Sequence, residues 1–331
     1  MLVPLDEQER LRHKRRNRAQ SLLLLGGMVV LLSACGWIVA GPDGIVWALI
    51  AGSVSLVFSP RISPKLVLSL YRARPLLPAE APAVHGVLAR ICERAGLPQV
   101  PALYYIPSRM LNAFAVGQSQ EAAIAVTDGL LRHLTLRELA GVLAHEVSHV
   151  RNRDLWIMGL ADAISRLTSV MSFFGMILLA IELPYLLVAE VEGVPWLLIA
   201  LLIFAPTIGS LLQLALSRTR EFDADLDAAG ITGDPRGLAA ALVKLERFQG
   251  GLLETLFLPG RRLPDPSLLR THPNTEERIQ RLLSLEERSE ILGHELERVG
   301  GPAISAGRQQ TFQSSPPPAR PPRWHVTGLW H

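Results

Sequence analysis

Residues 20–40, QSLLLLGGMVVLLSACGWIVA, contain no charged side chain. At about 1.5 Å per residue, a helix of this length is roughly 30 Å long, enough to cross the hydrocarbon core of a bilayer. The whole chain of 331 residues is 49% hydrophobic and only 19% charged, with a mean hydropathy of +0.27. We therefore expect a mainly α membrane protein, and two cysteines exclude a disulfide scaffold.

A second uncharged run, residues 44–60, follows the first across the turn sequence GPDG at 41–44. A basic block at residues 10–18 precedes the first run and further basic residues follow the second, whereas the turn has none. The positive-inside rule then places both ends of this transmembrane hairpin in the cytoplasm. Because the basic block lacks interleaved aromatic residues, we expect it to contact the lipid bilayer and expect no nucleic acid partner.

Two further apolar segments lie between residues 157 and 217. Residues 193–217 carry no charge and predict a membrane span. Residues 167–189 are interrupted by Glu182 and Pro184, which fits either a tilted span or a re-entrant segment. If both segments cross, the chain has four transmembrane helices.

The residues that carry chemistry are in the sequence HEVSH, where His145 and His149 lie four positions apart. On a helix this spacing places both imidazoles on one face, where they can chelate one zinc ion. The helix is well signalled, because Thr135 and Glu138 predict a capping box at its start. A catalytic zinc needs three protein ligands and one open position for water, and Glu146 would then act as the base.

Since chance alone can produce HEVSH, a third ligand has to be found elsewhere in the chain. The extended motif HExxHxxGxxH is excluded, because Asn152 and Leu155 stand where that motif needs Gly and His. A downstream glutamate is the other standard choice, and Glu221 and Asp225 follow the last apolar segment on an expected short helix ending at Gly230. Glu221 can ligate zinc while Asp225 accepts a hydrogen bond from a ligand histidine.

Motifs from four separate regions occur in order along the chain: LNAFAVG at 111–117, LAHEVSH at 143–149, the stretch 217–225 and THP at 271–273. Together they resemble the HtpX-like membrane zinc metalloproteases, relatives of the eukaryotic CAAX prenyl endopeptidases. The resemblance covers about residues 20–285 and is more specific than the zinc motif alone.

The resemblance implies a complete zinc site. His145, His149 and Glu221 would bind one Zn²⁺ per chain, Glu146 would activate water, and Asp225 would support a ligand. Taken alone, Glu221 would be interpreted as an ordinary solvated acid. Asp223, two residues further along, is expected to face elsewhere and to contribute little.

The resemblance also implies a substrate strand, formed by Asn112, Ala113, Phe114 and Ala115 at the edge of a small sheet. A protease that cuts varied sequences can hold its substrate there by main-chain hydrogen bonds. Without the resemblance, these residues would be an ordinary apolar strand.

His272 and Arg278 are implied to lie near the active site, as oxyanion donors or structural supports. By sequence alone, His272 is more often a residue at a helix end.

The sequence thus predicts four transmembrane helices plus a cytoplasmic gluzincin-type α+β metalloprotease domain with a small β-sheet, in the cell (inner or plasma) membrane. The implied activity is zinc-dependent cleavage of misfolded or membrane-associated polypeptides in quality control. The alternative is a zinc-binding membrane sensor or regulator without turnover. The expected organisation is a basic N-terminus (1–19), a membrane hairpin (20–60), a first catalytic part (61–156), a second membrane pair (157–217), a second catalytic part (218–299) and a disordered Pro-rich tail (300–331).

Overall fold

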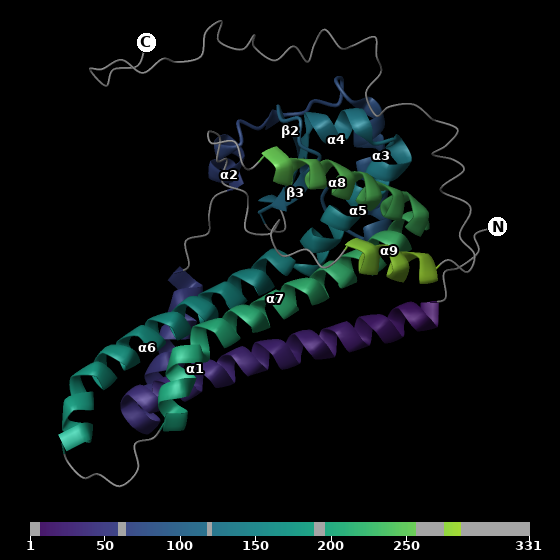
Figure 1. Ribbon diagram of the computed structural model, residues 1–331. Coiled ribbons are helices and arrows are strands. Elements are labelled where there is room, and N and C mark those ends of the chain that lie inside the picture. Colours follow the sequence, from purple (N-terminus) through teal and green to yellow (C-terminus); the bar gives the residue numbers. More distant parts are fainter. Residues whose placement is uncertain (1–6, 59–63, 118–120, 189–195, 256–274, 286–331) are drawn as a thin grey trace, which may run out of the picture.

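The computed structural model describes residues 7–58, 64–117, 121–188, 196–255 and 275–285. A bundle of long helices makes up one part of the molecule, and a smaller domain of helices and a sheet lies against one end of it (Figure 1). The mainly helical architecture with a small sheet is as predicted.

Three helices of the described chain are long and apolar enough to cross a membrane. They are α1 (Glu7–Phe58), α6 (Asp154–Val188) and α7 (Trp196–Thr232). The three pack side by side (Figure 1), around a shared core that includes Met28, Leu32, Ile164 and Leu216.

Helix α1 folds back on itself at Ala40 and Gly41, whose backbone angles are not helical. Gly41 has a φ of +61°, which favours glycine, and Pro42 follows at the start of the second arm. The arms touch so closely that a Cβ on Gly36 would lie 2.5 Å from the carbonyl oxygen of Gly44. The four predicted segments therefore lie in three helices, because both arms of the hairpin belong to α1.

One expectation about a helix boundary is wrong. Glu221 and Asp225 do not lie on a short helix, because residues 217–229 contain no Gly or Pro and α7 continues through them to Thr232. The HEVSH helix ends at Asn152 and is capped by Arg153, a left-handed residue with φ +55° and ψ +37°. Helix α6 begins at the next residue.

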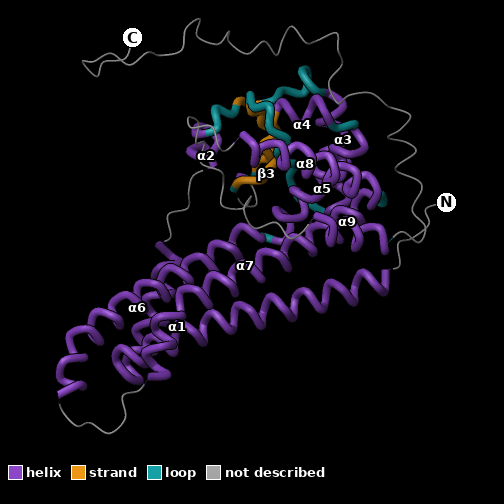
Figure 2. The backbone as a smooth tube through the Cα atoms, in the orientation of Figure 1, coloured by secondary structure: helices purple, strands orange, loops and turns teal. Residues whose placement is uncertain are grey.

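The smaller domain contains a four-stranded sheet in the order β1-β2-β4-β3. Strand β4 is parallel to β2 and antiparallel to β3, and β1 is antiparallel to β2. The strands gather in one small sheet among the helices (Figure 2). The strands are β1 (Arg74–Pro75), β2 (Ala102–Ile106), β3 (Ala113–Val116) and β4 (Ala123–Thr127). The helices are α2 (Pro64–Leu70), α3 (Pro82–Ala95), α4 (Asp128–His133), α5 (Leu136–Asn152), α8 (Pro235–Thr255) and α9 (Thr275–Ser284).

One face of the sheet packs with α3 and α5 into the main core, in which Leu88, Ile124 and Leu143 are 0% exposed. The other face is covered by α2, where Leu68 lies against Phe114. Since α5 is fixed on the sheet and β3 is an edge strand, the HEVSH residues lie beside a sheet edge with which no other described strand pairs.

Candidate metal centre

Helix α5 presents both histidines of HEVSH toward α7. The predicted capping box is formed: the Thr135 hydroxyl accepts a hydrogen bond from the Glu138 amide, and the Glu138 carboxylate accepts one from the Thr135 amide. The core face of the helix is fully buried, with Leu139 and Leu143 both 0% exposed. The histidines are on a different face, so capping and core packing together set their direction.

The ligand atoms from α5 and α7 converge on one point. The Nε2 atoms of His145 and His149 are 3.1 Å apart. Of the Glu221 carboxylate, Oε2 lies 3.5 Å from the His145 Nε2 and Oε1 lies 3.6 Å from the His149 Nε2. Tetrahedral zinc with bonds of about 2.0–2.1 Å holds its ligand atoms about 3.3–3.4 Å apart. The three residues are therefore spaced to hold one zinc ion.

Each imidazole has a carboxylate behind it. The Nδ1 of His149 is hydrogen-bonded to Asp154 at 2.8 Å. The Nδ1 of His145 lies 3.0 Å from Asp225, an ion-pair distance without the angles of a good hydrogen bond. Such carboxylates fix ring orientation and leave Nε2 for the metal.

Sequence analysis assigned no role to Asp154. Only the left-handed conformation of Arg153 turns the chain so that the first residue of α6 reaches back to His149. A non-glycine residue in this conformation has no clear sequence signature. The available signals were its place among the motifs that resemble the HtpX-like family and its spacing of five residues from His149.

Arg278 of α9 pairs with two carboxylates of α7, those of Asp225 and Glu221. Its guanidinium makes a bidentate pair with Asp225 at 2.6 and 2.7 Å and lies 3.2 Å from a Glu221 oxygen. Burial alone lowers the pKa of His145, but the facing carboxylates of Asp225 and Glu221 outweigh it and raise the pKa to about 10. The site without metal therefore attracts positive charge, as a cation site must.

Glu146 lies between α5 and the sheet edge and is 9% exposed. Its carboxylate accepts a hydrogen bond from the Ala115 amide at 3.0 Å. The Thr127 amide donates to the Asn112 carbonyl, so by alternation the main-chain groups of Ala113 and Ala115 point away from β4. The candidate base thus faces the open edge of β3.

Two further residues were predicted to belong to the site, Phe114 and His272. Phe114 turns its ring to the α2 face of the sheet, with its centroid 5.2 Å from that of Tyr71, and its amide and carbonyl point toward β4. His272 lies outside the described residues.

Comparison with known proteins identifies the family. The sequence model of Peptidase family M48 matches residues 78–286 of the chain. The chain belongs to this family. It is 38% identical over 292 residues to the "Protease HtpX homolog" of Acaryochloris marina, covering 82% of this chain and 95% of that protein. It is 37% identical over 300 residues to the homologue of the same name in Desulfatibacillum aliphaticivorans, covering 80% and 89%.

Among solved structures, the M48 chain is similar to the crystal structure of S. mikatae Ste24p. The TM-score is 0.43 at 19% sequence identity, over 82% of this chain and 66% of that one.

The predicted family resemblance and activity are confirmed by these relatives. This M48 peptidase is a membrane metalloprotease that acts on polypeptides and associates with the membrane through its apolar helices. A zinc-binding sensor without turnover is not favoured, since the relatives are named as proteases.

Proposed function

We propose that this protein is a zinc-dependent endopeptidase in which His145, His149 and Glu221 hold one Zn²⁺. The observation that carries the proposal is the set of three ligand-atom separations, 3.1, 3.5 and 3.6 Å. When bound, zinc supplies Lewis-acid chemistry and lowers the pKa of a water molecule to about 7.

Glu146 is proposed as the general base. Its carboxylate accepts the proton of the attacking water and then delivers it to the leaving amine. The Ala115 amide, 3.0 Å away, holds this carboxylate in place. Asp225 and Asp154 keep the two imidazoles oriented, and Arg278 supports Asp225 and offsets the charge of Glu221 rather than contacting substrate.

The substrate is proposed to be an extended polypeptide segment that pairs with the edge of β3. The amide and carbonyl of Ala113 and the carbonyl of Ala115 face outward there, while the Ala115 amide donates to Glu146. Because main-chain pairing reads no side chains, such an edge accepts many sequences when they are unfolded. This suits misfolded or membrane-associated proteins and a role in protein quality control.

Four membrane crossings are proposed: the two arms of α1, then α6 and α7. Basic residues flank the hairpin and the turn within it has none, so both ends face the cytoplasm of a cell (inner or plasma) membrane. The catalytic domain, contributed by residues 61–156 and 218–299, follows on that side.

The test uses the purified full-length protein in detergent with an unfolded casein substrate. Zinc-loaded protein should cleave casein, a chelator should stop cleavage, and added zinc should restore it. Tight retention of zinc with no cleavage of casein or other unfolded proteins would instead favour the sensor or regulator.

A further inference from the structure

The first arm of α1 packs against the polar end of α7 through buried hydrogen bonds. Asn17 donates to Asp223 at 2.6 Å, and Arg220 donates to the Ser21 hydroxyl at 2.8 Å. Lys14 forms an ion pair with Asp227 at 2.8 Å. The predicted membrane anchor therefore also binds the helix that carries Glu221.

Asp223, expected from its spacing to face away from Glu221 and to contribute little, is a buried residue. It is 2% exposed and bonded to Asn17 and Arg220. It does face away from the metal centre, but α1 rather than water covers that face of α7.

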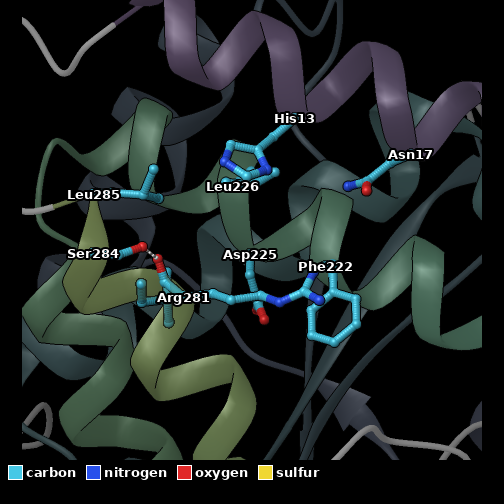
Figure 3. Close-up of a pocket in the computed structure, with 9 residues that line it drawn as sticks. His13, Asn17, Phe222, Asp225, Leu226, Arg281, Ser284 and Leu285 are labelled. Atoms are coloured by element: carbon cyan, nitrogen blue, oxygen red, sulfur yellow. Dashed lines mark hydrogen bonds between the residues drawn. The ribbon is translucent and has the colours of Figure 1, made fainter.

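Figure 3 shows where α1 leaves α7 partly open. A pocket of about 60 Å³ lies there, with His13 and Asn17 of α1 facing Phe222 and Leu226 of α7. Arg281 of α9 lies over the Phe222 ring at 3.7 Å. The contact between α1 and α7 is thus polar and tight around Arg220 and looser toward α9.

Arg220 connects this contact to the metal centre. It is 6% exposed, and its Nη1 lies 3.6 Å from Oδ1 of Asp154. The other oxygen of Asp154 is bonded to His149. Among the described residues Asp154 Oδ1 has no hydrogen-bond partner, so its facing charge is the Arg220 guanidinium.

We propose that Arg220 is a positioning residue that holds the Asp154 carboxylate against His149 and ties this pair to the N-terminal arm of α1. The inference rests on the proposed zinc site. The planar guanidinium spans three helices at once, reaching Ser21 on α1, Asp154 on α6 and Asp223 on α7. Without it, Asp154, at 3% exposure, is a buried carboxylate facing no cation and turns away from the imidazole.

The expected size of the effect follows from the position of Arg220. Loss of a carboxylate that orients a metal-binding histidine typically costs roughly 10–100-fold in metal affinity. Because Arg220 acts through such a carboxylate, Arg220→Gln should weaken zinc binding about tenfold, at the lower end of that range.

The experiment measures zinc affinity of the full-length protein in detergent by competition with a chromogenic chelator. The matched control is Arg218→Gln, the same change at an exposed position on α7, which should bind zinc as the wild type does. Arg220→Lys restores the charge but not the three-way contact, so its affinity should lie between the two. The visible spectrum of Co²⁺-loaded protein should change in Arg220→Gln and not in Arg218→Gln.

A second pair of variants tests the link to α1. Ser21→Ala removes a partner of Arg220, whereas Gln20→Ala changes an exposed neighbour. Ser21→Ala should weaken zinc binding about threefold, less than Arg220→Gln, because Ser21 acts only through Arg220. Combined with Arg220→Gln, it should add little further loss, since both changes break one network.

The outcomes separate this inference from the proposed function. Wild-type zinc affinity in folded Arg220→Gln, or additive losses in the double variant, would overturn the inference and leave the zinc site intact. If wild-type protein itself binds no zinc, the proposed function falls and the inference with it. Thermal unfolding checks each fold; if Arg220→Gln does not fold, unchanged zinc affinity in both Arg220→Lys and Ser21→Ala overturns the inference.

Discussion

The two imidazoles of the metal centre are supported in parallel but unequal ways. Behind His145 stand Asp225 and then Arg278, and we call these three residues the domain arm. Behind His149 stand Asp154 and then Arg220, the membrane arm. Arg278 donates two hydrogen bonds of 2.6 and 2.7 Å to the Asp225 carboxylate. The nearest contact between Arg220 and Asp154 is an ion pair with an N–O distance of 3.6 Å.

The difference between the arms shows how the site is divided between two environments. The arginine of the domain arm comes from α9 of the smaller domain, while that of the membrane arm is also bonded to Ser21 of α1. The domain arm is therefore fixed by charge pairing at close range. The membrane arm depends on how the membrane helices pack.

The largest effects are expected where both arms meet. Replacement of His145, His149 or Glu221 by Ala should abolish both zinc binding and cleavage, because two ligands do not complete the shell. Glu146→Gln should lower cleavage by orders of magnitude while zinc content stays near that of the wild type. Metal analysis and casein cleavage on the same samples check both outcomes, and zinc loss in Glu146→Gln would contradict its assignment as the base.

Replacing the carboxylate of each arm by an amide compares the two arms directly. Asp225→Asn and Asp154→Asn should each weaken zinc binding roughly 10–100-fold, with the larger loss for Asp225. Asp225 also anchors Arg278, and breaking a buried ion pair costs about 3–5 kcal/mol. Asp225→Asn should therefore lower the thermal midpoint as well. Equal losses in zinc affinity and in midpoint for the two variants would remove the distinction between the arms.

The pH dependence sharpens the comparison for the domain arm. With Asp225 and Glu221 raising the pKa of His145 from 6.5 to about 10, the metal-free site carries an extra proton at neutral pH. The stabilisation from this proton is complete below pH 6.5 and is lost as the pH rises toward 10. Zinc must displace the proton, so zinc affinity should rise with pH, up to about tenfold per unit.

Calorimetry in buffers of different ionisation enthalpy measures the protons released on zinc binding. Asp225→Asn, which removes one cause of the raised pKa, should release fewer protons than the wild type at the same pH. A wild-type zinc affinity that does not change between pH 6.5 and 8 would contradict the proton displacement.

The smallest expected effect lies outside both arms. Thr135→Ala removes the N-cap of α5 and should cost about 1 kcal/mol of stability. The zinc affinity of the folded protein should stay unchanged, because the core face of α5 still fixes the direction of the histidines. Denaturant unfolding and the chelator assay distinguish the two quantities, and a clear drop in affinity would show that the cap itself aligns the ligands.

Local patterns predicted much of this molecule. The capping box and the HEVSH helix each depend on residues within a few positions of one another. Glu221 and Asp225 were proposed as the standard downstream acids after the last apolar segment and then supported by the family resemblance, because nothing local brings α7 to α5.

The contacts that the sequence did not predict join distant segments or depend on a single backbone conformation. Asp223 is covered by a helix some two hundred residues earlier in the chain, as its bond to Asn17 shows. Asp154 reaches His149 only because Arg153 adopts a left-handed conformation that its residue type does not predict. Spacing along one helix tells which side a residue faces, but not what covers that side.

The continuity of α7 has a geometric consequence for its apolar segment. Since the helix is unbroken from Trp196 to Thr232, each residue turns the chain about 100° and advances it about 1.5 Å on the way to Glu221. Adding or removing a single residue in the apolar part would swing the carboxylate out of line with the two imidazoles. The number of residues in this stretch, as well as their packing, therefore sets the rotational phase of a proposed zinc ligand.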